Sequence, residues 1–376
     1  MKYIHIVQFH LMAGGGVGSV ITDVCEAMAK RSGQVYVISL FQHERVDFAR
    51  ELEWAAQVGV HSILLQQDKK DTVLHVLRAL RREIKSLAQD EECVLYLHLK
   101  WGVLAGILAT LGLKNVRRVE VYHSGYMHYK LQAFFSKPFI EKYIAVSKDA
   151  RRQLIEWFHV KEEKILVVYN GVDVSGIREI AWEAEPISGG IAFLSVGRLS
   201  FEKGFKTPIQ AYAELRRDGI LDGTSYTMVG TGNQMEECVS LAEGKVDFTG
   251  LIERKAVYRK IAGADVMILP SLWEGNSILM LEVLALGKPM VLTDIPSFRE
   301  VLGFSPLEEG ELCRREWFGV VFRKEDVSSC RQAITKAFSL RDSFPEMSQR
   351  IAALGDKFST ERQARDYMRV LHKTEQ

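Results

Sequence analysis

Residues 191–204 read Ile-Ala-Phe-Leu-Ser-Val-Gly-Arg-Leu-Ser-Phe-Glu-Lys-Gly. The first part of this stretch, Ile191–Val196, is a short apolar run that ends at a glycine, which is typical of a strand buried within a parallel sheet. The loop that follows, up to Gly204, then lies at the carboxyl edge of that sheet, where open α/β sheets bind their ligands. The stretch therefore predicts both a fold class and the edge at which a site is expected.

Outward from this stretch, short apolar runs alternate with amphipathic helical patterns in both directions. This alternation predicts right-handed βαβ units, and hence an α/β fold with parallel sheets covered on both faces. In the second half, strands are predicted at Ile191–Val196, Ser225–Val229, Val246–Phe248, Val266–Leu269 and Pro289–Thr293. In the first half, they are predicted at Ile4–Phe9, Val35–Leu40, Ser62–Leu65, Val94–His98, Arg118–Tyr122, Tyr143–Val146 and Ile165–Tyr169.

The alternation pauses over residues 171–190, which are rich in glycine and show no clear period. We interpret this segment as a linker between an N-terminal domain, residues 1–170, and a C-terminal domain, residues 191–355. A last helical stretch, about Thr360–Lys373, follows the completed series in a C-terminal segment, residues 356–376. We hypothesise that this helix packs back across the domain boundary.

Composition excludes several classes of protein. The chain has 376 residues, of which 47% are apolar and 26% charged, so it is neither disordered nor collagen-like. Its 49 Lys and Arg residues nearly balance 48 Asp and Glu residues, which argues against a strongly basic nucleic-acid binder. The five cysteines are far apart and form no C-x-x-C pair, which favours reduced thiols in a cytosolic protein over a zinc or disulfide site.

Two segments have an apolar character that could indicate a membrane or secretory role. Met1–Ala13 has some features of a signal peptide, but His5, Gln8 and His10 interrupt its apolar run, so we expect a buried first strand instead. Trp101–Leu113 is the longest apolar stretch, and it is too short to span a bilayer.

The glycine loop Gly14–Ser19 lies between the first predicted strand and the first helix. Glycines let the backbone approach a ligand closely, and a helix N-terminus offers free N–H groups to an anion. The loop is not a phosphate-binding loop of the Walker type, because no Gly-Lys-Ser/Thr follows. It fits the dinucleotide fingerprint only with Ser19 as the third small residue. A tight structural turn is the alternative.

Arg198 and Lys203 are five residues apart in the loop after Val196. Arginine offers a planar fork of donors and lysine a mobile point charge, so the two can converge on one dianion. The alternative is a pair of solvated surface charges.

The segment Pro270–Ser277 follows another predicted strand, and Glu282 comes eight residues after Glu274. Ser277 is expected to cap the helix that begins there. Glu282 stands among apolar neighbours, where an unpaired carboxylate is costly. Hydroxyls such as a ribose diol would satisfy it, and so would a salt bridge to a nearby Lys or Arg.

Taken together, these segments resemble the retaining nucleotide-sugar glycosyltransferases of family four. That family has the GT-B fold, in which two Rossmann-like domains face each other across a cleft. No single segment is specific, but their order and spacing over nearly the whole chain are. In order, the matching segments are Gly14–Ser19, Tyr143–Lys148, Tyr169–Asp173, Val196–Lys203, Met228–Gly232, Phe248–Gly250, Glu274–Glu282 and Leu286–Pro289.

The resemblance implies roles for individual residues. Arg198 and Lys203 would hold the donor diphosphate as it leaves, and Glu274 would lie near the transferred sugar. His123 matches the family's histidine beside the reacting sugar, with a packed loop histidine as the alternative. The remaining donor-binding residues implied are Gly15, Gly16, Gly230, Leu251, Asn276, Ser277, Ile278 and Glu282.

Within that set, Glu282 would accept hydrogen bonds from the ribose hydroxyls, and backbone N–H groups around Asn276–Ile278 would cap the distal phosphate. Gly15 and Gly16 would face the donor phosphate or the acceptor, and backbone around Leu251 would touch the base. The family usually has an aromatic or aliphatic residue where this chain has Asn276, so the donor sugar is not implied.

The chemistry of the donor is consistent with these residues. Breaking a glycosyl–phosphate bond leaves negative charge on the diphosphate, which requires cations or helix N-termini. The chain has no Asp-x-Asp motif, so no metal is expected and Arg198, Lys203 and a helix dipole would serve instead. The resemblance implies a UDP-sugar donor, or alternatively a GDP-sugar, and no cofactor.

The acceptor side is expected in the first domain. Trp101–Arg152 carries nine Lys or Arg against three Asp or Glu, with aromatic residues interleaved, and Arg78, Arg81, Arg82 and Lys85 lie on an earlier helix. Such a mixture of basic and aromatic residues suits an anionic membrane surface. We therefore hypothesise a peripheral enzyme on the inner face of the cytoplasmic membrane. Its acceptor would be a lipid-linked glycan that it extends for a surface polysaccharide. A solvated helix face beside an aromatic core is the alternative.

Two other functions remain open at this stage. One is another GT-B enzyme, either a nucleotide-sugar epimerase or a sugar phosphorylase. The other is a non-catalytic member that only binds nucleotide or glycan. The spacing of Arg198 and Lys203 and of Glu274 and Glu282 disfavours the first, and the presence of all four expected site residues argues against the second.

Overall fold

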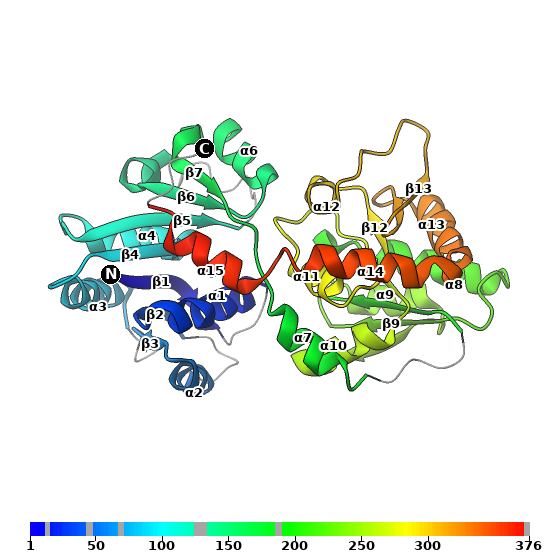
Figure 1. Ribbon diagram of the computed structural model, residues 1–376, viewed down its shortest axis with the longest axis horizontal. Coiled ribbons are helices and arrows are strands. Elements are labelled where there is room, and N and C mark those ends of the chain that lie inside the picture. The colour runs from blue at the N-terminus through cyan, green and yellow to red at the C-terminus, as the bar shows by residue number, and fades with distance from the viewer. Residues whose placement is uncertain (12–15, 43–47, 67–70, 124–133, 185–189, 372–376) are drawn as a thin grey trace. The chain divides into compact units, whose positions relative to one another are not determined.

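The computed structural model describes residues 1–11, 16–42, 48–66, 71–123, 134–184 and 190–371 (Figure 1). The chain divides into two compact units, Met1–Gly171 together with Thr360–Gln376, and Val172–Ser359. Each unit contains one seven-stranded sheet. The α/β class with two mainly parallel sheets is thereby confirmed, and every strand predicted from the sequence is present with ends shifted by two residues at most.

The sheet of the first unit has the order β3-β2-β1-β4-β5-β6-β7, and all its neighbouring strands are parallel. The strand order reverses between β1 and β4, and in sheets of this kind ligands bind outside the carboxyl ends of the strands near such a reversal. The strands are β1 Lys2–Phe9, β2 Val35–Phe41, β3 His61–Leu64, β4 Cys93–His98, β5 Val116–Tyr122, β6 Lys142–Ala145 and β7 Ile165–Val167.

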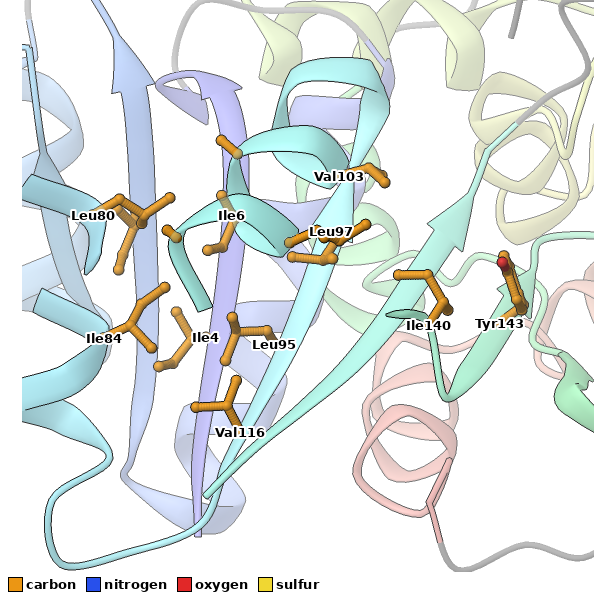
Figure 2. Close-up of a cluster of buried hydrophobic side chains, with 14 of the residues drawn as sticks. Ile4, Ile6, Leu80, Ile84, Leu95, Leu97, Val103, Val116, Ile140 and Tyr143 are labelled. Carbon is orange, nitrogen blue, oxygen red and sulfur yellow. The ribbon is translucent and has the colours of Figure 1, made fainter. Parts of the chain in front are cut away.

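One face of this sheet is covered by α3 (Val73–Leu87), α4 (Leu99–Thr110) and α6 (Lys148–Glu156). Figure 2 shows the cluster beneath α3, where Leu80 and Ile84 lie beside Ile4 of β1. All three side chains are fully buried. Burying a Leu or Ile side chain contributes roughly 1.5–3 kcal/mol, so the cluster fixes the central strands beneath the helices.

The opposite face is covered by α1 (Gly16–Ser32), α2 (Ala49–Val58) and α15 (Thr360–Met368). Helices α1 and α15 lie side by side on this face although they are far apart in the sequence (Figure 1). Met28 of α1 and Tyr367 of α15 are both fully buried in the shared cluster.

The last helix is attached to the first unit by polar contacts as well. The hydroxyl of Tyr96 donates a hydrogen bond to the backbone oxygen of Tyr367 at 2.8 Å. The side-chain oxygen of Gln363 accepts one from the backbone N–H of Gly171 at 2.8 Å, and Arg362 donates one to the backbone oxygen of Tyr169 at 2.7 Å. This packing agrees with the hypothesis that the C-terminal helix returns to the first domain.

The sheet of the second unit has the order β10-β9-β8-β11-β12-β14-β13. Its strands are parallel except for β13, which pairs antiparallel with β14 at one edge. The strands are β8 Ala192–Val196, β9 Ser225–Val229, β10 Asp247–Gly250, β11 Val266–Leu269, β12 Met290–Thr293, β13 Cys313–Glu316 and β14 Gly319–Phe322.

The helices of the second unit form two packed groups. The first group is α8 Lys206–Arg217, α9 Met235–Ala242 and α13 Val327–Ser339. The second is α7 Val174–Ala181, α10 Arg254–Gly263, α11 Ile278–Ala285 and α14 Phe344–Gly355. One further short helix, α12, spans Pro296–Leu302.

The segment expected to be a linker, residues 171–190, instead contains α7. The Asp173 side chain accepts a hydrogen bond from the backbone N–H of Gly176 at 3.0 Å and so caps this helix. Ile177 is buried, and the helix packs on α10 and α11. The helix has only eight residues, too few for a 3.6-residue period to be visible in the sequence.

The hairpin β13–β14 was not predicted. Trp317 and Phe318 connect its strands, and neither residue is a turn signal. The four residues of β13 include Arg314, Arg315 and Glu316, which hides an apolar alternation. Charged residues are common on edge strands because they discourage pairing with other chains.

None of the helices among the described residues is both long enough and apolar enough to cross a lipid bilayer.

Candidate functional site

Two loops meet at the carboxyl edge of the second unit's sheet, one after β8 and one after β11. The backbone N–H of Leu272 donates a hydrogen bond to the backbone oxygen of Glu202 at 2.9 Å. Gly204 has a φ of +65°, and a Cβ atom there would lie only 2.3 Å from the backbone oxygen of Pro270. Only glycine permits this approach, so the local sequence is what brings the two loops together.

The contact places two of the predicted site residues side by side. Lys203 Nζ donates a hydrogen bond to Glu274 Oε1 at 2.6 Å, and Ser271 Oγ donates one to the same oxygen at 2.8 Å. The Lys203 and Glu274 side chains keep exposed fractions of 30% and 13%. The pair is therefore partly accessible, and a ligand can share either charge.

Arg198 lies in the same loop as Lys203, and its side chain is exposed. Its guanidinium forms no hydrogen bond or ion pair with the described residues. Burial by itself would raise the pKa of Glu202, but hydrogen bonds from Ser200 and from the backbone, together with the charges of Arg198 and Lys203, lower that pKa below its ordinary value. The loop thus carries two cations, Arg198 and Lys203, beside the ionised Glu202.

Gly230 follows β9 and packs against the loop after β8. Its φ is +133°, and a Cβ atom at this position would lie 1.9 Å from the backbone oxygen of Gly197. The backbone N–H of Leu199 donates a hydrogen bond to the oxygen of Thr231 at 3.0 Å, which joins the two loops. Gly230 therefore has a structural reason to be glycine, whatever contact it makes with a donor.

Helix α11 begins directly after the Glu274 loop. Ser277 Oγ accepts a hydrogen bond from the backbone N–H of Met280, at 3.4 Å, which confirms the predicted cap. Ile278 is the first helical residue, and the Asn276 and Ser277 side chains are buried. The first N–H groups of a helix carry partial positive charge, so this terminus favours an anion.

Glu282 lies one turn into α11, and its side chain is 10% exposed. Tyr258 donates its hydroxyl proton to Glu282 Oε1 at 3.0 Å, and Arg254 lies 3.5 Å from the same oxygen. Of the two partners considered for Glu282, the salt bridge is thus present in this structure. Leu251, directly after β10, is 78% exposed.

The remaining predicted residues belong to the first unit. His123 follows β5 and its Nε2 lies 3.0 Å from Nδ1 of His98, whose Nε2 in turn lies 3.0 Å from Nδ1 of His5. Burial lowers the pKa of His123 to about 4, so its imidazole is neutral at neutral pH. Gly16 is the first residue of α1, whereas Gly15 lies outside the described residues.

Four residues that were not predicted extend these contacts: His98 bonds His123, His5 bonds His98, and Arg254 and Tyr258 both bond Glu282. His5 and His98 occupy strand positions that alternation places on one face of the sheet, so strand parity together with strand order would have found them. Tyr258 and Arg254 are four residues apart and lie on one side of α10, which a helical projection would have shown.

Across the part of the chain that the structure describes, no group of three or more His, Cys, Asp or Glu side chains is placed to hold a metal ion.

Two family models match the chain. One, described as glycosyltransferase family 4, matches residues 14–175, and the other, described as glycosyl transferases group 1, matches residues 190–339. The first match lies almost wholly in the first unit and the second lies in the second unit.

Individual proteins agree with these models. An uncharacterised glycosyltransferase of Methanocaldococcus jannaschii is 28% identical over 174 residues, which is 42% of this chain and 44% of that protein. A Campylobacter jejuni N-acetylgalactosaminyltransferase that acts on a diphospho-undecaprenol glycan is 26% identical over 231 residues, 59% of this chain and 58% of that protein. The chain thus spans about half the length of these curated relatives.

Solved structures resemble the chain over its full length. The Anabaena protein HepE in complex with UDP and glucose superposes with a TM-score of 0.76 at 15% identity, covering 99% of each chain. A glycosyltransferase of Rickettsia africae also gives 0.76, at 17% identity and 99% coverage of each chain. At such identities the likeness of the solved structures shows the fold alone, and the assignment to a family comes from the two family models. The chain belongs to the group 1 glycosyltransferases and has their GT-B fold.

Proposed function

We propose that this protein is a retaining glycosyltransferase that moves a sugar from a nucleoside-diphosphate sugar to a glycan or lipid-linked glycan, without a metal ion. The observation that carries this proposal is the pairing of Lys203 with Glu274, at 2.6 Å, in loops that also hold the exposed Arg198. Cations beside a carboxylate suit a reaction in which one part of the donor becomes negative and another positive.

The proposed step can be written with its bonds. The bond from the anomeric carbon of the sugar to the phosphate oxygen breaks, and both electrons stay on that oxygen. The acceptor hydroxyl oxygen bonds to the anomeric carbon on the same face, and its proton ends on the departing diphosphate. Arg198 and Lys203 stabilise the negative charge, and Glu274 lies near the sugar, which is positive in the transition state.

The donor nucleotide would occupy the same edge of the second sheet. The start of α11 would bind the distal phosphate through its N–H groups, and Glu282 would exchange its contact with Arg254 for the ribose hydroxyls. The exposed Leu251 would lie against the base. A UDP-sugar is the first candidate, since HepE was solved with UDP and with UDP-glucose, and a GDP-sugar is the second.

The acceptor class is proposed from two relatives. The Campylobacter enzyme named above acts on a glycan linked to diphospho-undecaprenol, and an α-monoglucosyldiacylglycerol synthase of Streptococcus pneumoniae, 24% identical over 243 residues, is named for a lipid product. Both favour an acceptor that carries a lipid, and from the first we propose a lipid-linked glycan that is extended for a cell-surface polysaccharide. His123, in the first unit, would contact the acceptor or the transferred sugar.

A surface of the first unit supports docking to an anionic membrane. An open, shallow depression of about 390 Å³ on α3 is lined by Arg78, Arg81, Arg82, Lys85, Ser86 and Gln89. Arg81 donates hydrogen bonds to the backbone oxygens of Ala109 and Leu111 at 2.9 Å each, so the basic row adjoins the end of α4. There Leu108 is 54% exposed and Leu111 41% exposed. Basic and apolar side chains on one surface suit an interfacial position.

Turnover of single variants tests the catalytic proposal. In Arg198→Ala and Lys203→Ala, transfer should fall by roughly 10²–10³, the usual cost of removing one donor that stabilises an oxyanion. Lys206→Ala is the matched control, because Lys206 begins the next helix and its described ion pair is with the exposed Glu237 on the surface. Wild-type turnover in both site variants would refute the proposed roles.

Three measurements test the finer points. Activity should persist in excess EDTA, and a loss that a divalent ion restores would overturn metal independence. NMR of the fresh product should show the anomeric configuration of the donor. A labelled donor without acceptor should remain largely unchanged, whereas an epimerase would convert it.

Co-sedimentation with anionic phospholipid vesicles tests membrane docking. We expect binding at low salt that Arg78→Glu with Arg82→Glu abolishes. The control, Lys324→Glu with Lys336→Glu, makes the same charge change at exposed positions of the second unit and should bind as the wild type does. Absence of binding by the wild type at low salt would remove this part of the proposal.

A further inference from the structure

Three histidines form a line across the first sheet. His5 is on β1, His98 ends β4, and His123 follows β5, and these strands are neighbours in the order β1-β4-β5. In the register, His5 pairs with Tyr96 and His98 pairs with Val121, so each successive histidine lies two residues further toward the carboxyl edge. Steps of two residues keep all three side chains on one face.

The line is continuous in its hydrogen-bonding atoms. Nδ1 of His5 lies 3.0 Å from Nε2 of His98, and Nδ1 of His98 lies 3.0 Å from Nε2 of His123. The ring centroids are 5.2 and 5.3 Å apart. At these distances each gap holds one hydrogen bond, with one nitrogen as donor and the other as acceptor.

The two ends of the line differ. His5 is fully buried, and the Tyr96 and Tyr367 rings lie 4.7 and 6.2 Å from its ring. Its Nε2 is buried and has no hydrogen-bond partner among the described residues. His123 is only half-buried, and no described residue bonds its Nδ1. One end of the line therefore lies in the core, and the other lies at the edge where ligands are expected.

The buried end decides the direction of the hydrogen bonds. A neutral imidazole has one N–H and one bare nitrogen. Buried N–H groups without an acceptor are rarer in proteins than acceptors without a donor, so the partnerless Nε2 of His5 should be the bare nitrogen. The His5 proton is then on Nδ1 and is donated to His98, which in turn carries its own proton on Nδ1 and donates it to His123.

We propose that His5 and His98 are positioning residues for His123, which they hold as the tautomer with an N–H at Nδ1, directed away from the line. His123 then offers a fixed hydrogen-bond donor to an oxygen of its ligand and does not act as a proton acceptor. That the ligand is the transferred sugar or the acceptor rests on the proposed function, whereas the tautomer does not.

The charge state of the line is consistent with this arrangement. Burial lowers the pKa of His5 to about 3 and that of His123 to about 4, and burial together with His5 and His123 lowers the pKa of His98 well below its ordinary range. All three rings are neutral at neutral pH. A positively charged ring would have N–H groups on both sides and would break the single direction of donation.

The tautomer is tested on the full chain labelled with ¹⁵N-histidine, without substrate. Long-range ¹H–¹⁵N spectra distinguish a protonated ring nitrogen from a bare one, and loss of signals in each single variant assigns them. We expect all three histidines to be protonated at Nδ1 and bare at Nε2. Protonation of His123 at Nε2, or at both nitrogens, at neutral pH would overturn the proposal.

A second variant tests the rule that sets the direction. In His5→Phe the buried Nε2 of His98 loses its partner, so by the same rule this nitrogen stays bare and His123 should keep its proton on Nδ1. His61→Phe is the control, because His61 is an exposed histidine of the same sheet and stacks on Tyr36 outside the line. Protonation of His123 at Nε2 in His5→Phe would overturn the rule that sets the direction of donation.

Turnover tests the positioning role. His98→Phe should lower kcat by tenfold or more, whereas His98→Asn, whose amide can still donate to His123, should recover most of the loss. KM for the nucleotide donor should stay within about twofold in both, because the proposed contacts of its nucleoside and diphosphate are in the second unit. Equal kcat in His98→Phe and the wild type would overturn the positioning role but would not affect the proposed function. Absence of transfer in the wild type would overturn the proposed function but would not affect the tautomer result.

Discussion

Acidification should destabilise the first unit while leaving the second unchanged. The unfolded chain protonates His5, His98 and His123 near pH 6.5, but burial keeps them neutral in the fold to far lower pH. Stability is therefore complete above about pH 6.5 and falls as pH drops below it, by about 1.4 kcal/mol per pH unit for each histidine. Burial raises the pKa of Glu120 to about 7, so its protonation in the fold offsets one histidine.

The net expectation is a loss of about 3 kcal/mol in the first unit between pH 5.5 and 4.5, where the unfolded histidines are almost fully protonated and two protons are uncompensated. Hydrogen exchange, corrected for its intrinsic pH dependence, should show β1 and β4 opening about a hundredfold more readily at the lower pH. The second unit, residues 172–359, contains no histidine and serves as the internal reference. In His5→Phe the dependence of the first unit's free energy of unfolding on pH should be weaker by the equivalent of one proton, about 1.4 kcal/mol per pH unit. Equal protection of β1 and β4 at the two pH values would refute this account of the line.

Three further predictions concern single side chains. Gly230→Ala should lower the stability of the second unit by roughly 2–3 kcal/mol, measured by urea unfolding, because its Cβ atom would overlap the Gly197 oxygen at 1.9 Å; an unchanged midpoint would contradict the close approach. Glu282→Gln should weaken binding of UDP or GDP by roughly 10–100-fold in calorimetry, since hydrogen bonds to a charged group contribute about 1.5–3 kcal/mol. The control, Glu236→Gln at an exposed position, should bind as the wild type does, and equal affinities of Glu282→Gln and the wild type would exclude Glu282 from the nucleotide site. Tyr96→Phe should cost the first unit about 1 kcal/mol by loss of its bond to the Tyr367 oxygen, and a melting temperature equal to that of the wild type would show that this bond does not hold α15.

Most of the fold follows from local patterns. Strands such as Val266–Leu269 are buried on both faces and therefore appear as uninterrupted apolar runs bounded by polar residues. The exceptions are segments whose structure depends on distant partners. Helix α7 is stabilised by α10 and α11, and β13 depends on pairing with β14, so neither is visible in its own residues.

In the candidate site, too, some features follow from local sequence and others depend on distant contacts. The positions of Lys203 and Glu274 at one sheet edge follow from strand ends, and both are where the loops were expected. Their ion pair depends on the contact of Gly204 with Pro270, which joins residues some 66 positions apart along the chain. The sequence of neither loop predicts this contact. The Glu282 contact with Tyr258 likewise depends on the packing of α10 beside α11.

The return of α15 to the first unit affects the order in which the protein is made. The ribosome synthesises residues 1–171 first, but the buried Tyr367 and Ala364 that complete their core are translated only after all of Val172–Ser359. The second unit is continuous in sequence and can fold as soon as it emerges, whereas the first must wait with His5 and Tyr96 uncovered. Residues 1–171 are thus translated before the second unit but reach their native state after it, and termination of translation before Thr360 would damage the first unit.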